Sequence, residues 1–422
     1  MQMPRRLRVG IGFATGRKTF QTVLRTYTQS WQEAGLVDDT SVSLNLFVAY
    51  DLSSNNTHQT DYTRMRPELD SCIDTTTFVN SGARNEAIGK LIRDHVLDYQ
   101  EALLLFGEGL AAQRNAILYS CLNRHMDHLV FLDDDEYPMA VTNTGKTASW
   151  TGQHVLTTHL SSITRADITH GHQCGYISPI PNIDFNNTLM ETDFRLFIEA
   201  VSNDIVSWDK LEKVRKNGGV TYADAGVLAS NSAVEVQEVE NAKFISGSNL
   251  CINLRNPLRV FPFYNPPGAR GEDTFLSTCL SERTVLRVPC YTFHDGFGIY
   301  EHLLHGVLPI RLKFVKADTE CIVSRFYNAC IGWIRYKPLF TFITQRQGYE
   351  ETITGMRERL NDTLPLVSEY FGRPAFLNIA TELEKYHRNV EEHYGVFAET
   401  QRIWARIMEH CAQDQGRSAS EV

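Results

Sequence analysis

Four consecutive acids, Asp133 to Glu136, follow directly after a short apolar run, Leu129 to Leu132. Like charges packed this closely repel one another, and removing them from water is costly. A bound Mg²⁺ or Mn²⁺ relieves both costs, because hard cations bind carboxylate oxygens and commonly bridge to phosphates. The run therefore predicts a metal site that handles a phosphorylated substrate. A solvated acidic turn is the alternative that fits the same composition.

The residues around the acids predict how the fold presents them. The apolar run has the length and composition of a buried strand in a mostly parallel sheet. The acids would then lie just beyond its carboxyl end, where open α/β sheets bind ligands. Alternate side chains of an extended strand point to opposite sides. We therefore expect Asp133 and Asp135 to share the ligand side, with Asp134 and Glu136 in supporting roles.

Hydrophobic patterning predicts an α/β fold over the first three quarters of the chain. A strand at residues 7–15, a helix at 19–35 and a strand at 43–50 form a unit typical of parallel sheets with a right-handed crossover. We expect a mixed, mostly parallel sheet flanked by helices. The further expected strands are 129–132, 174–180, 244–253 and 285–293, and the further helices are 84–104, 107–122 and 152–168, with 141–150 as a loop.

The character of the chain changes near residue 316, beyond which helical periodicity dominates. The expected helices are 321–333, 349–366, 376–394 and 396–411. Pro338, Pro365 and Pro374 punctuate these segments, because proline ends or kinks helices. We therefore expect a catalytic domain at residues 1–315, a helical C-terminal region at 316–412 and a flexible tail at 413–422.

Composition excludes several classes of protein. The 422 residues are 42% hydrophobic with a net charge of −9, which fits a packed globular protein and disfavours broad nucleic-acid binding. The nine cysteines form no Cys-x-x-Cys pair, so they indicate reduced thiols. The N-terminus has no apolar core of signal-peptide type and no stretch is long enough to span a membrane. We expect a cytoplasmic protein.

Four further polar segments stand in order around the acid run. A carboxylate at a strand end can accept a base N–H, an arginine can pair with a diphosphate, a small-residue corner allows close approach of a sugar, and a carboxylate can act as a base. The segments are Asp51 with Ser53 and Thr57, Gly109 with Arg114 and Asn115, Gly247 with Asn249, and Glu272 with Asp273.

This order over residues 7–300 resembles the glycosyltransferases of the GT-A fold, in particular the large inverting family of nucleotide-sugar enzymes. Members of that family have a strand-end Asp, a Gly-x-x-x-x-Arg-Asn helix, an Asp-x-Asp motif, a Gly-Gly-Asn-type strand and a Glu-Asp pair. The chain departs from the family at the end of its first strand and in Ser246-Gly247-Ser248-Asn249, which replaces Gly-Gly-Asn. The resemblance implies a Rossmann-like GT-A sheet, and the C-terminal helical region is additional to it.

The resemblance also implies roles for individual residues. Asp273 would be the general base, and Glu272 would orient the acceptor. Mn²⁺ or Mg²⁺ would be held by Asp133, Asp135 and His294. The residues implied at the nucleotide-sugar donor are Ala14, Thr15, Asp51, Arg114, Asp133, Asp134, Gly247 and Asn249. Arg84, in a second Ala-Arg-Asn segment, is the alternative to Arg114 at the diphosphate.

The expected activity is transfer of a sugar from a nucleoside-diphosphate donor to an acceptor hydroxyl, with inversion. The acceptor would be a carbohydrate, a lipid-linked molecule or a small molecule, and a lipid acceptor would place the protein at the inner face of the membrane. The C-terminal helices would shape the acceptor site or form a homodimer. The alternatives are a nucleotidyltransferase, for which Gly16-Arg17-Lys18 is a faint indication, and a non-catalytic nucleotide- or sugar-binding module.

Overall fold

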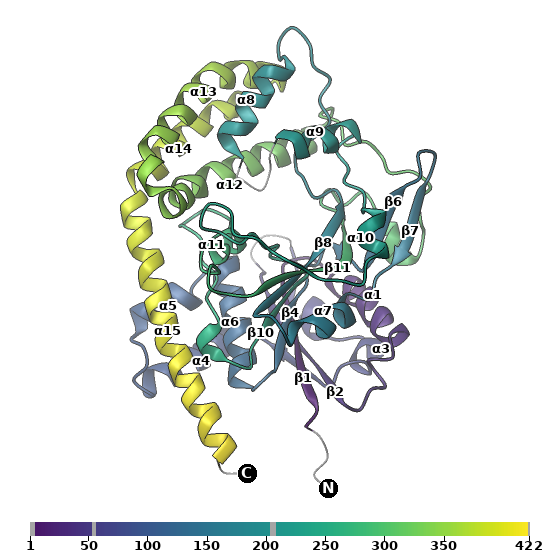
Figure 1. Ribbon diagram of the computed structural model, residues 1–422, viewed down its shortest axis with the longest axis vertical. Helices are drawn as coiled ribbons and strands as arrows, with labels where there is room; N and C mark the ends of the chain where they lie inside the picture. The colour runs from purple at the N-terminus through teal and green to yellow at the C-terminus, as the bar shows by residue number, and fades with distance from the viewer. Residues whose placement is uncertain (1–4, 53–55, 203–207, 421–422) are drawn as a thin grey trace.

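The computed structural model describes residues 5–52, 56–202 and 208–420. Its centre is a nine-stranded sheet in the order β3-β2-β1-β4-β10-β8-β11-β5, with β9 paired to β11, beside a separate β6–β7 hairpin (Figure 1). The strands are β1 (Leu7–Thr15), β2 (Val42–Tyr50), β3 (Thr75–Phe78), β4 (His128–Phe131), β5 (Glu136–Tyr137), β6 (Met139–Asn143), β7 (Ala148–Gly152), β8 (Ile168–Gly175), β9 (Val234–Glu235), β10 (Leu250–Asn253) and β11 (Val285–His294).

The sheet is mixed, as expected, and six of its nine described strands run in one direction. Among the described strands, four pairings are parallel, which join β3 to β2, β2 to β1, β1 to β4, and β8 to β11. Four others are antiparallel, because β10 runs against both of its neighbours and β5 and β9 run against β11. The α/β class and the helical C-terminal region are confirmed.

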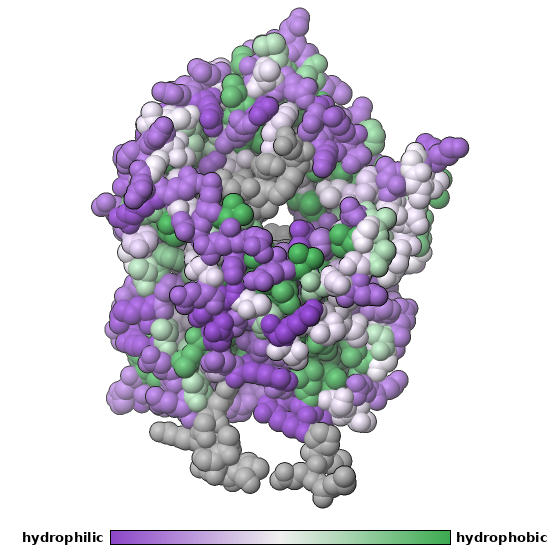
Figure 2. Space-filling view, viewed as in Figure 1, coloured by the Kyte–Doolittle hydropathy of each residue, from purple (hydrophilic) through white to green (hydrophobic). Residues whose placement is uncertain are grey.

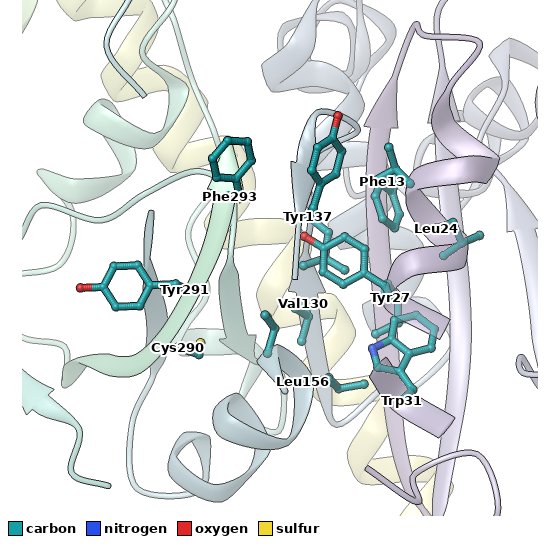
Figure 3. Close-up of a cluster of buried hydrophobic side chains, with 14 of the residues drawn as sticks. Phe13, Leu24, Tyr27, Trp31, Val130, Tyr137, Leu156, Cys290, Tyr291 and Phe293 are labelled. Atoms are coloured by element: carbon teal, nitrogen blue, oxygen red, sulfur yellow. The ribbon is translucent and has the colours of Figure 1, made fainter. Parts of the chain in front are cut away.

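One face of the sheet is covered by α1 (Phe20–Glu33) and α7 (Val155–Ile163). Apolar residues of α1 recur every three or four positions, so they form one stripe that faces the sheet. Tyr27 and Trp31 of this stripe point toward Val130 and Leu156 (Figure 3). This packing fixes the start of α1 beside the carboxyl end of β1.

The opposite face is covered by α4 (Ser81–Arg93), α5 (Tyr99–Phe106) and α6 (Leu110–Asn123). Two glycines of β1 let α6 approach the sheet closely. A Cβ at Gly10 would lie 2.9 Å from the Cys121 sulfur, and one at Gly12 would lie 3.0 Å from Ile117 Cγ2. A side chain at either position would crowd the helix that carries Arg114.

The helical region is built from α12 (Glu320–Thr344), α13 (Tyr349–Tyr370), α14 (Asn378–Arg388) and α15 (Val390–Ser420), and α8 (Glu191–Val201) packs against it. Pro338 and Pro365 lie inside α12 and α13, so neither proline marks a boundary between helices. Buried side chains all along these helices outweigh the hydrogen bond that each proline removes.

Helix α15 runs back along the α4–α6 side of the molecule (Figure 1). Ile403, Trp404 and Ile407 are buried in the same apolar cluster as Phe106. The Trp404 indole N–H donates to the carbonyl of Val260 at 3.0 Å. The helix continues to Ser420, through residues 413–420 of the tail that was expected to be flexible.

The remaining helices are short connections. They are α2 (Gln59–Thr63), α3 (Pro67–Asp70), α9 (Trp208–Lys216), α10 (Ala225–Ala229), α11 (Glu272–Ser277) and the 3-10 turns η1 (Pro257–Arg259), η2 (Glu301–His305), η3 (Arg346–Gly348) and η4 (Pro374–Leu377). Residues 141–150, expected as a loop, belong to the β6–β7 hairpin, whose polar strands hide the usual strand pattern. The helix expected at 84–104 is two helices, α4 and α5, and the strand expected at 174–180 ends at Gly175.

All nine cysteines are free thiols. None of the described helices combines the length and the apolar composition that crossing a bilayer requires.

Candidate active site

The acids form a turn between β4 and β5, in which the N–H of Glu136 lies 3.4 Å from the carbonyl of Asp133. The prediction that Asp134 points away from Asp135 was wrong, because a turn does not alternate as a strand does. Both carboxylates meet Arg17, whose Nε lies 3.3 Å from Asp134 and whose Nη2 lies 2.8 Å from Asp135. Thr15, at the end of β1, donates its hydroxyl to Asp134 at 2.5 Å.

Glu136 is the acid that points into the protein, and it is 2% exposed. Ser248 and Thr292 each donate a hydroxyl to its carboxylate at 2.5 Å, and the Gln173 amide donates to it as well. Burial raises the pKa of Glu136, and His294 together with the hydroxyls of Ser248 and Thr292 opposes the rise. Glu136 therefore links β5, β8, β11 and the segment just before β10 below the site.

His294, the last residue of β11, pairs with β5 and brings its Nε2 to 3.3 Å from Asp135 Oδ2. Burial favours the neutral form of Asp135, but His294 and Arg17 outweigh it and hold the pKa of that carboxyl well below its usual range. Burial lowers the pKa of His294, and Asp135 more than offsets this and raises it to about 9. The two side chains thus form an ion pair at the base of the site.

The predicted metal ligands are only partly brought together. Within the described ranges, no group of three or more His, Cys, Asp or Glu side chains is arranged to hold a metal ion. Asp135 and His294, 3.3 Å apart, have the separation of two ligands on one cation with bonds of about 2.1 Å. Asp133 instead pairs with Arg114. A cation at this position would have two protein ligands, Asp135 and His294.

Arg114 connects the acid turn to the other predicted motifs. Its side chain is 3% exposed; Nη2 lies 3.1 Å from Asp133, Nε lies 3.5 Å from Glu272, and Nη1 donates to the carbonyl of Gly247. Nη1 and Nη2 have protein acceptors, whereas Nε has Glu272 as an ion-pair neighbour and no hydrogen bond. Arg114 therefore positions these segments, and its contact with a diphosphate stays a prediction. The alternative, Arg84, donates to the carbonyl of Gly107 at 2.7 Å and supports the start of α6.

Asp133 keeps an accessible surface, because 35% of its side chain is exposed. Its partial burial and the neighbouring acids nevertheless raise its pKa to about 8, against the effect of Arg114. Asn115, the next residue on α6, has a structural role, because its amide exchanges hydrogen bonds of 2.9 and 2.8 Å with the backbone of Phe263.

Asp273 lies in the first turn of α11 and is half-buried. Its Oδ2 accepts the N–H of Gly247 and its Oδ1 accepts that of Thr274, both at 2.9 Å. A Cβ at Gly247 would lie 3.2 Å from this carboxylate, so a side chain there would crowd it. Burial and the neighbouring Glu272 raise the pKa of Asp273 to about 6, which suits a general base near neutral pH.

The other predicted donor-site residues lie in different environments. Asn249 is fully buried, and its amide contacts His159 at 2.8 Å and the carbonyl of His172 at 3.2 Å. Its side chain therefore holds β10 and β8 together and has no surface for a ligand. Asp51 is half-buried at the end of β2, where its N–H donates to the carbonyl of Thr15 at 2.9 Å.

Ala14 is half-buried and lies next to Thr15, so the ends of β1 and β2 remain adjacent to the acid turn. Its contact with a donor stays a prediction. Ser53 of the predicted motif lies outside the described residues. Thr57, the other member of that loop motif, is 6% exposed.

Two arginines that sequence reasoning did not place in the site border the acids. Arg17 follows β1 directly, and 43% of its side chain is exposed. Arg325 of α12 lies over the ring of Phe297. Burial lowers the pKa of Arg325, and the nearby charges of Asp135 and Arg17 also act on it. A basic residue straight after the first strand was a usable indication, whereas the position of Arg325 depends on tertiary packing.

A pocket of about 400 Å³ opens beside the Arg17 turn, and none of the four acids at 133–136 lines it. Its rim is basic on the side of α1 and of the segment that follows Asp51. It is lined by Lys18, Gln21, Thr60, Asp61, Arg64, Met65, Arg66 and Pro67.

No model of a known protein family matches the chain, and no curated protein matches it significantly.

Proposed function

We propose that the protein is a metal-dependent glycosyltransferase of the GT-A fold that transfers a sugar from a nucleoside-diphosphate donor to a hydroxyl with inversion. One observation supports this above all. Arg114 joins Asp133 of the acid turn to Glu272 and to Gly247, and Gly247 in turn donates to Asp273. Motifs up to 159 residues apart in the sequence, from Arg114 to Asp273, therefore meet in one site, in the combination that such a transferase needs.

Asp273 is assigned as the general base. Its carboxylate is fixed by two backbone N–H groups, and its pKa of about 6 leaves it ionised at neutral pH. It accepts the proton of the acceptor hydroxyl as that oxygen attacks the donor sugar. Glu272, held by Arg114, orients the acceptor beside it.

The donor side is assigned to the acid turn. Asp135 and His294 would hold Mn²⁺ or Mg²⁺, which when bound supplies positive charge to the leaving diphosphate. Arg17 is exposed enough to pair with the same diphosphate through parallel hydrogen bonds. Asp51, at the end of β2, would accept a hydrogen bond from the base of the nucleotide.

The acceptor is assigned to the side of α11 and the helical region, since Phe275 of α11 is buried in the apolar cluster of those helices. A carbohydrate, a lipid-linked molecule or a small molecule bearing a hydroxyl would bind there. A homodimer through the C-terminal helices and a cytoplasmic location belong to the same proposal.

The test begins with a panel of nucleoside-diphosphate sugars, screened by thermal unfolding with and without Mn²⁺. The correct donor raises the melting temperature by mass action when its concentration exceeds the dissociation constant. Transfer to acceptors is then followed by release of the nucleoside diphosphate. A donor that binds equally to wild type and Asp273→Asn, with equal transfer rates, would exclude Asp273 as the base.

A nucleotidyltransferase is the second candidate, because Arg17 follows the first strand and contacts the acids. Such an enzyme would release pyrophosphate from a nucleoside triphosphate and a sugar phosphate. A non-catalytic binding module would bind the donor and release neither product.

A further inference from the structure

Two surface segments that lie side by side contain no carboxylate side chains. The hairpin formed by β6 and β7 (139–152) and residues 302–317 lack Asp and Glu, although 50 of the 422 residues are acidic. The N–H of Ala148 in β7 donates to the carbonyl of Ile310 at 2.8 Å, which joins the two segments. We call the two segments together the acid-free face.

Exposed apolar side chains concentrate on this face. Val307, Leu308, Ile310 and Phe314 are 56%, 46%, 72% and 60% exposed. Single exposed apolar residues are ordinary, but four within eight positions mark a surface that excludes water when it meets a partner. Pale and green atoms cover the β6–β7 hairpin at the right of Figure 2, with purple atoms at its tip.

Cations accompany the apolar side chains. Lys146 lies at the tip of the hairpin, and Arg311, Lys313 and Lys316 lie in the second segment; all four are exposed. Arg311 Nε donates to the carbonyl of Lys146 at 3.3 Å, so the hairpin tip and the second segment present their charges together. The face is thus locally basic in a chain whose net charge is −9.

The second segment is held in place by the protein beneath it. Leu312 and Val315 are buried, and the Tyr300 hydroxyl accepts the N–H of Lys313 at 2.6 Å. The Trp150 indole of β7 donates to the carbonyl of Pro309 at 2.8 Å. The apolar side chains are therefore displayed by an ordered segment.

We propose that the acid-free face docks on a bilayer surface rich in anionic headgroups. Apolar side chains enter the boundary between headgroups and acyl chains, and neighbouring Lys and Arg side chains pair with lipid phosphates. The absence of carboxylates removes repulsion from an anionic surface. A nucleic acid would use the cations but not the apolar side chains. The proposal does not depend on the catalytic assignment.

The test is co-sedimentation of the full-length protein with vesicles, either of phosphatidylcholine alone or of phosphatidylcholine mixed with phosphatidylserine. We expect binding to the mixed vesicles that weakens as salt is added. Leu308→Ser with Ile310→Ser should lower the partition coefficient by about tenfold or more. Lys146→Glu with Arg311→Glu should remove the preference for phosphatidylserine.

A matched control replaces two exposed apolar residues elsewhere, Val234→Ser with Leu377→Ser, at positions 67% and 47% exposed. It should bind vesicles as the wild type does, and all variants should keep the wild-type melting temperature. The proposal would be overturned if the control variant lost as much vesicle binding as Leu308→Ser with Ile310→Ser. It would also be overturned if the protein bound both kinds of vesicle equally, or if it associated with itself without lipid.

Discussion

Removing the Arg17 side chain is predicted to strengthen the binding of a divalent cation at the acid turn. Its guanidinium contacts both Asp134 and Asp135, at 3.3 and 2.8 Å. A divalent cation that binds Asp135 must displace it. Arg17→Ala should therefore tighten the binding of Mn²⁺ alone.

The magnitude follows from the exposure of the pair. Two unit charges about 4 Å apart interact by roughly 4 kcal/mol at an effective dielectric constant of 20. The Arg17 side chain is 43% exposed, so water screens it and the value falls toward about 1 kcal/mol. That free energy corresponds to a dissociation constant for Mn²⁺ roughly fivefold lower in the variant.

Titration calorimetry with MnCl₂ measures this constant directly, without knowledge of the donor. Lys18→Ala removes an equal charge one residue away and is the matched control, with an expected change below about twofold. Asp135→Asn should abolish Mn²⁺ binding. If Arg17→Ala bound Mn²⁺ with unchanged or lower affinity, the competition between this arginine and a cation at Asp135 would be refuted.

Three further predictions concern the base, a buried contact and the last helix. Asp273→Asn should lower kcat by about 10²- to 10⁴-fold. The wild-type rate should rise with pH and reach half its plateau near pH 6, because the carboxyl of Asp273 must lose its proton. A rate that does not change between pH 5 and pH 7 would contradict this assignment. Gly171→Ala places a Cβ 2.0 Å from the Asn249 amide and should cost about 1–3 kcal/mol in urea unfolding, whereas Gly152→Ala, with open space around it, should cost less than about 0.5. Trp404→Ala should cost about 3–5 kcal/mol, and a loss below about 1 would show that α15 is not part of the core.

Local patterns predicted the parts of the fold that depend on local physics. The strands at 7–15 and 285–293 and helix α1 were correct, because each has a clear apolar period and a buried face. The β6–β7 hairpin was missed because its strands are largely polar. The helix-breaking effect of proline was overestimated in α12 and α13, where tertiary packing offsets the lost hydrogen bonds.

The site was predictable as a set of segments but not as a set of contacts. The acid turn and Asp273 were found because acids after a strand and at a helix start are visible in sequence. The partners of Arg114 and the contact of Arg17 with Asp134 depend on where elements far apart meet in the fold. The burial of Asn249 could not be predicted for the same reason, because its sequence context also fits a ligand contact.

The path of helix α15 has a consequence for the chain during its synthesis. The apolar cluster that includes Phe106 and Tyr119 is completed only by Ile403 and Trp404. About 280 residues separate these two groups, which a ribosome adds in roughly 15–60 s at typical rates. During that time the apolar surface of α5 and α6 has been synthesised but is not yet covered by α15. The nascent protein therefore offers a binding site for a molecular chaperone that the finished protein lacks.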